Sequence, residues 1–220
     1  MSINNKFKED LETFLSKIAN NLEIKEVNKL TRLKERLVKL HLKGLVKINH
    51  SIMELLCARY LISNGYNVKL EFPLNKTLTC DVYAIKGNGS LIVEIETGFI
   101  PPEHALDPAI YTKARIISKI ARYSQFAEKF AIGVPPYYML QFPMIFAIPP
   151  RARNKEKVKE MKNLCDVYYK NPPISLKEIQ NARLHTIYII DVDNTKVIEV
   201  DPEPYWETVL KWNYEFNLVF

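Results

Sequence analysis

Apolar and polar residues follow two different spacings along this chain, and each spacing predicts one kind of element. Apolar residues three or four positions apart predict helices, at about 4–20, over 21–48 and over 51–63. Alternation of apolar and polar residues predicts strands, one over 67–72 and a pair within 78–97. The pair is joined by Lys86-Gly87-Asn88-Gly89, which is typical of a tight turn, so we expect an antiparallel hairpin.

The second half of the chain continues this mixture of helices and strands. Asp107 and Pro108 form a helix start signal, and the apolar spacing predicts a helix from there to about Lys129. We predict further elements in this order: a strand at 130–134, a strand-like segment at 137–148, helices at 154–169 and 175–182, and a hairpin at 185–192 and 196–200. The order predicts an α/β fold with a central mixed β-sheet flanked by helices. The last hairpin either extends this sheet or forms a dimer surface.

Proline clusters rather than Gly/Ser linkers separate the parts of the chain, which favours one compact unit. We divide it into a basic helical extension at 1–48, a core at 49–150 and a C-terminal part at 151–220 that packs on the core. The 220 residues are 47% apolar, which is enough for a hydrophobic core. No apolar run approaches the length of a membrane span, and the cysteines have no zinc-binding spacing, so we expect an intracellular, cytoplasmic protein.

Three carboxylates stand at the ends of the predicted hairpin at 78–97. Glu94 and Glu96 are two positions apart and therefore point to the same side of their strand, and the turn folds Asp81 back toward them. Like charges this close raise one another's pKa unless a cation lies between them. Mg²⁺ prefers oxygen ligands and keeps several waters, so two or three carboxylates are enough to bind it. The other interpretation is that Glu94 and Glu96 form the solvated face of a half-exposed strand.

Glu54 adds a fourth carboxylate, inside the apolar helix at 51–63. The chain thus presents a helix with a Glu, a strand, a hairpin with Asp and Glu-x-Glu, a long helix and a strand. This order resembles the PD-(D/E)XK nuclease superfamily over roughly 50–135. The resemblance implies a restriction-endonuclease-like core in which Glu54, Asp81 and Glu94 bind Mg²⁺ (or Mn²⁺). The segments EIETG, PPEHALDP and FAIGVPP are also similar to nuclease-like proteins of crenarchaea and their spindle-shaped viruses.

The chain departs from the superfamily pattern at two positions. Cys80 stands in place of the motif proline, and Glu96 in place of the motif lysine, which helps to position the attacking water. Some members carry this lysine on the following helix, so we assign its role to Lys119 and expect Glu96 to bind the metal or to orient water. On the same helix we expect three phosphate contacts, Lys113, Arg115 and Arg122. The alternative is that these are solvated helix charges.

Positive charge is concentrated in the segment 21–48, and the whole chain has a net charge of +6. A basic helix beside a metal site favours a polyanionic substrate, and we expect Lys29, Arg32 and Arg36 to bind nucleic acid. A solvated helix face and a coiled-coil seam between two protomers are the other interpretations. His50 and His104 could each approach a metal or a phosphate, but we interpret them as ordinary surface or capping histidines.

These residues together predict a Mg²⁺-dependent DNA endonuclease that hydrolyses phosphodiester bonds and acts as a homodimer on junction, flap or duplex DNA. Holliday-junction resolution is one role that fits, and repair or recombination cleavage is another. The catalytic residues would be Glu54, Asp81, Glu94, Glu96 and Lys119. The alternative, suggested by Glu96, is a nucleic-acid-binding protein on a nuclease fold that has lost catalysis. A third hypothesis is an interaction protein whose acidic strand faces a basic partner.

Overall fold

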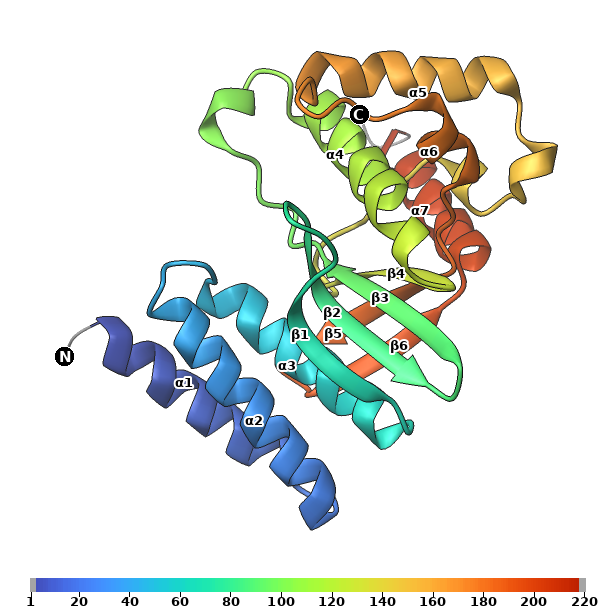
Figure 1. Cartoon of the computed structure of the whole chain (residues 1–220). Coiled ribbons are helices and arrows are strands. Elements are labelled where there is room, and N and C mark those ends of the chain that lie inside the picture. Colours follow the sequence, from blue (N-terminus) through green and yellow to red (C-terminus); the bar gives the residue numbers. More distant parts are fainter. Residues whose placement is uncertain (1–2, 218–220) are drawn as a thin grey trace.

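A mixed β-sheet organises the fold (Figure 1). In the computed structural model, which describes residues 3–217, six strands lie in the order β1-β2-β3-β4-β5-β6. Strands β1 to β3 are antiparallel, β3 to β5 are parallel, and β6 is antiparallel to β5. Their bounds are β1 Asn67–Pro73, β2 Thr79–Lys86, β3 Gly89–Ile95, β4 Lys129–Val134, β5 Thr186–Asp191 and β6 Lys196–Val200. The predicted C-terminal hairpin is therefore β5 and β6, and it extends the central sheet.

Helices cover both faces of this sheet, α1 to α3 on one and α4 to α7 on the other (Figure 1). Their bounds are α1 Ile3–Ile18, α2 Ile24–His41, α3 Ile48–Ser63, α4 Pro108–Tyr123, α5 Lys155–Tyr168, α6 Leu176–Asn181 and α7 Pro202–Asn217. The predicted α/β class, with a mixed sheet flanked by helices and further helices at the amino-terminal end, is confirmed. Within residues 3–217 no helix has both the length and the apolar composition that crossing a membrane requires.

Helix α3 is the central element of the first face, because it packs between the sheet and the pair α1 and α2. Its sequence is apolar around most of the helix surface, as expected for a helix that is covered on several sides. The apolar stripe of α2, Leu30, Leu33 and Leu37, is buried in the same hydrophobic core. A seam with a second chain is therefore not needed to cover this stripe.

Some predicted boundaries are wrong, and each has a local cause. The segment 137–148 forms no strand, since the prolines at 135, 136, 143 and 149 remove backbone donors that a sheet ladder needs. It contributes Leu140 and Phe146 to the core of the second face instead. Helix α4 ends at Tyr123 rather than near Lys129, because a 3₁₀ turn follows and the chain must enter β4. The basic helix predicted at 21–48 covers only Ile24–His41, after which the chain turns at Gly44, where φ is +71°.

Candidate metal centre

The β2–β3 ladder opens at the position of the predicted acidic residues. The last backbone pair is Val82 with Val93, and beyond it carboxylates replace the backbone acceptors. The Asp81 N–H donates to Glu94 Oε1 at 3.1 Å, and the Ile95 N–H donates to Asp81 Oδ2 at 2.5 Å. These two side-chain hydrogen bonds connect β2 and β3 at the point where their backbone pairing ends.

The separation is accompanied by a kink in β2. Residues two apart on a strand normally share a face, yet Val82 packs in the core on the α3 face and Cys80 in the core on the α4 face. The kink lies at Asp81, between these two residues. It places the Asp81 carboxylate at the edge of both cores, within reach of α3 and α4.

On the α3 side, Asp81 meets two residues that lie one helical turn apart. His50, Glu54 and Asp81 each offer one ligand atom, and these atoms lie within 4.8 Å of one another. Glu54 is fully buried, and within the described part of the chain neither of its carboxylate oxygens has a hydrogen-bond partner. Burial, and then the charge of Asp81, raise the pKa of Glu54 well above its usual range.

An unpartnered buried carboxyl group normally destabilises a protein by about 1–3 kcal/mol. Here the cost is offset if a cation binds between the three residues. One imidazole nitrogen and two carboxylate oxygens form a donor set that suits divalent metal ions such as Mn²⁺ and Mg²⁺. The residues present at this position therefore fit a divalent metal, and the orphaned oxygens of Glu54 are the observation that separates them from an ordinary acidic cluster.

On the α4 side, Lys119 lies between the two glutamates of β3 and its extension. Its Nζ is 3.5 Å from Glu94 Oε2 and 3.6 Å from Glu96 Oε2, and it donates to the Ile95 carbonyl at 2.8 Å. Burial by itself lowers the pKa of Lys119, but the surrounding carboxylates, with Glu94 first, outweigh it and raise that pKa. Lys119 is thus a largely buried cation, with 20% of its side chain exposed. The predicted common face of Glu94 and Glu96 agrees with these contacts.

Arg115, one turn before Lys119, completes this ion network. Its guanidinium pairs with Glu96 and donates to the Phe99 carbonyl. Gly98 permits this path of the chain: its φ is +77°, and a Cβ there would clash with the ring of Tyr138. Glu96 is therefore neutralised by two cations from α4.

The other predicted nucleic-acid contacts lie apart from this centre. Arg122 donates to the Pro172 carbonyl at 2.7 Å, and Lys113 is exposed in a different hollow, beside Trp206. On α2, Lys29 and Arg32 are exposed. Arg36 is exposed as well, but its guanidinium is bound to backbone carbonyls of β1. The nucleic-acid roles of these residues stay predictions.

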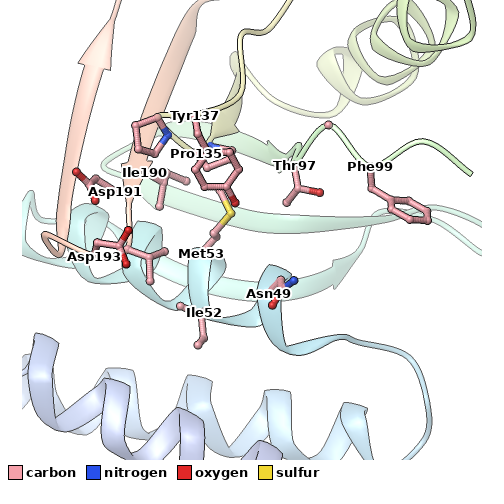
Figure 2. Close-up of a pocket in the computed structure, with 13 residues that line it drawn as sticks. Asn49, Ile52, Met53, Thr97, Phe99, Pro135, Tyr137, Ile190, Asp191 and Asp193 are labelled. Atoms are coloured by element: carbon pink, nitrogen blue, oxygen red, sulfur yellow. The ribbon is translucent and has the colours of Figure 1, made fainter. Parts of the chain in front are cut away.

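Two adjoining hollows open beside the centre. Figure 2 shows the first, of about 500 Å³, with Asn49 of α3 on one side and Tyr137 on the other. The second, of about 530 Å³, is lined by His50 and Glu71. Asn49 and Phe99 line both hollows, so the two adjoin, and His50 connects the second hollow to the cluster.

Two residues of this region were not predicted as site residues. His50 was interpreted as a surface or capping histidine, but the structure places it with Glu54 and Asp81. Its spacing of four from Glu54, which sets both side chains on one helix face, was a usable signal. Glu71 gave no such signal, since it lies in an ordinary apolar-polar alternation between Leu70 and Phe72.

Comparisons of this chain with protein-family profiles, with curated proteins and with solved structures found no match. A functional assignment must therefore come from the arrangement of the chain's own residues.

Proposed function

We propose that this chain is a metal-dependent nuclease that hydrolyses phosphodiester bonds in DNA, on a core of the restriction-endonuclease type. One observation carries the proposal, the fully buried and unpartnered carboxylate of Glu54 beside Asp81 and His50. A protein retains such a group at a cost to stability, and function is the common reason. The resemblance of the acidic residues to the PD-(D/E)XK pattern supports nuclease chemistry in particular.

In this proposal His50, Glu54 and Asp81 hold a divalent metal, Mg²⁺ or Mn²⁺. Bound there, the metal would neutralise the phosphate and lower the pKa of a coordinated water. Glu94 stands behind Asp81, to whose N–H it is hydrogen bonded, and its place as a direct ligand stays a prediction. An imidazole ligand favours Mn²⁺ over Mg²⁺, which prefers oxygen donors.

Lys119 takes the place of the missing motif lysine. Its ammonium group is cationic and buried between Glu94 and Glu96, close enough to the metal ligands to stabilise negative charge that develops on the phosphate. Arg115 neutralises Glu96, so the substitution at this motif position does not leave an unpaired negative charge facing the substrate. Net positive charge on the chain, +6, favours a polyanionic substrate.

A second candidate is a nucleic-acid-binding protein without catalysis. One observation favours it: Lys119 already contacts Glu94, Glu96 and the Ile95 carbonyl, which leaves little of its hydrogen-bonding capacity for a substrate. The two candidates differ in turnover rather than in DNA affinity.

A cleavage assay separates them. Labelled junction, flap, duplex and single-stranded DNA are incubated with the protein in Mg²⁺, in Mn²⁺ or in EDTA. The nuclease proposal expects cleavage of at least one substrate in Mn²⁺, weaker cleavage in Mg²⁺ and none in EDTA. Tight DNA binding with no product in either metal would favour the silent binder instead.

A further inference from the structure

Glu71 has an unusual backbone conformation for its position. Among residues 3–217, the non-glycine residues with positive φ are Asn21, Glu71 and Thr195. Asn21 lies between α1 and α2 and Thr195 between β5 and β6, both in turns, whereas Glu71 lies inside strand β1 with a φ of +48°. A left-handed conformation costs roughly 1 kcal/mol for a residue with a Cβ, so something must hold it there.

The strained residue interrupts the pairing of β1 with β2. Backbone pairs connect Leu70 with Val82 and Phe72 with Cys80, but Glu71 and Asp81 between them do not pair. Leu70 packs in the core on the α3 face and Phe72 against the core on the α4 face, although they are two apart on one strand. The β1 kink thus lies directly opposite the Asp81 kink.

The kink brings Glu71 beside the metal centre, although its carboxylate is not among the ligand atoms that lie within 4.8 Å of one another. Glu71 and His50 line the same hollow of about 530 Å³. Burial, and then the charge of Asp81, raise the pKa of Glu71 to about 7, and the charge of Glu71 in turn contributes to the raised pKa of Glu54.

Arg36 of α2 holds the strained segment in place. Its Nε donates to the Leu70 carbonyl and its Nη2 to the Glu71 carbonyl, both at 2.7 Å. The guanidinium fork is planar and rigid, so two such bonds fix the peptide between these carbonyls. Arg36 thus donates to two successive carbonyls where the ladder is interrupted, and it connects the amino-terminal helices to the centre.

We propose that Glu71 is a further ligand of the metal centre, and that Arg36 is the positioning residue that aims it. The inference rests on the proposed function only for the presence of a metal, and it extends the centre beyond His50, Glu54 and Asp81. Helix α2 then helps to position a metal ligand through Arg36, in addition to any role in DNA binding.

Calorimetric titration with Mn²⁺ tests the inference without relying on activity. Glu71→Gln keeps the size of the side chain but removes its charge, and it is expected to weaken Mn²⁺ binding about tenfold or more. Arg36→Met is expected to weaken Mn²⁺ binding by about tenfold, because mutation of a residue that positions a metal ligand commonly has an effect of this size. Because Arg36 acts through Glu71, adding Arg36→Met to Glu71→Gln should cause no further loss. Lys39→Met, which removes an exposed cation from the same helix, should bind Mn²⁺ as the wild type does.

A second variant excludes misfolding as the cause. Glycine adopts positive φ without strain, so Glu71→Gly should melt no lower than the wild type and still bind Mn²⁺ weakly. Wild-type affinity in Glu71→Gln, or an equal loss from Arg36→Met in both backgrounds, would overturn the inference. Absence of Mn²⁺ binding by the wild type would overturn both it and the metal centre. Mn²⁺ binding that depends on Glu71 without DNA cleavage would contradict only the nuclease proposal.

Discussion

Asp81→Asn is expected to lower the rate of metal-dependent DNA cleavage by more than about 100-fold, while DNA affinity stays the same or rises. Mutation of residues that only support metal ligands typically costs up to roughly 100-fold, and the loss of a ligand should cost more. Asp81 offers the carboxylate that lies within 4.8 Å of the ligand atoms of both His50 and Glu54. Asparagine still provides an oxygen to accept the Ile95 N–H, so the strand end should keep its shape. Removal of a negative charge also removes repulsion of the DNA phosphates. Initial cleavage rates in Mn²⁺ and a fluorescence-anisotropy binding curve give the two quantities.

Asp201→Asn is the matched control for this prediction. Asp201 is an exposed acid between β6 and α7 that lines neither hollow beside the centre, and its replacement should leave the cleavage rate within a factor of about two. If Asp81→Asn cleaves DNA within tenfold of the wild-type rate, Asp81 is not a ligand of the reacting metal and the assignment is wrong.

Lys119→Met is expected to destabilise the protein by about 3–5 kcal/mol, the usual result of removing one partner from a buried ion pair. Methionine fills much of the same space but leaves the buried carboxylates of Glu94 and Glu96 without this cation, and the Ile95 carbonyl without its donor. Cleavage by the folded fraction should also fall, because the proposal assigns to Lys119 the stabilisation of phosphate charge. Urea unfolding followed by circular dichroism at neutral pH measures the stability.

Lys113 supplies the comparison for Lys119 on the same helix. It is exposed, so Lys113→Met should change the free energy of unfolding by no more than about 0.5 kcal/mol. A Lys119→Met protein that unfolds within about 1 kcal/mol of the wild type would show that the network around Glu94 is not held by this cation.

Local sequence signals predicted much of the fold, for physical reasons that act over a few residues. Gly87 has a φ of +59° in the tight turn between β2 and β3, which glycine adopts without steric cost. Ser175 forms a capping box with Glu178 at the start of α6, and Asn154 caps α5. The common face of Glu94 and Glu96 followed from strand alternation alone.

The features that sequence reasoning missed depend on contacts between distant segments. The guanidinium of Arg36 holds the carbonyls of Leu70 and Glu71, which lie 34 and 35 positions further along the chain. The sequence predicted a nucleic-acid contact for Arg36, which stays a prediction, but it gave no sign of this contact. The kink at Glu71 is stabilised by that contact and leaves no mark in the alternation of apolar residues. Asp107 shows the same limit: helix α4 starts after it as predicted, but its carboxylate accepts from Tyr168 of α5 rather than capping the helix.

Calorimetric titration of the wild type and of Glu54→Gln with Mn²⁺ tests whether His50, Glu54 and Asp81 bind a divalent metal. The wild type should bind Mn²⁺, and Glu54→Gln should bind it at least about tenfold more weakly, since a neutral amide replaces a charged ligand. Metal-free stability should not fall in the variant, because the carboxylate of Glu54 makes no hydrogen bond within the described residues. Failure of the wild type to bind Mn²⁺, or equal binding by both proteins, would contradict the account.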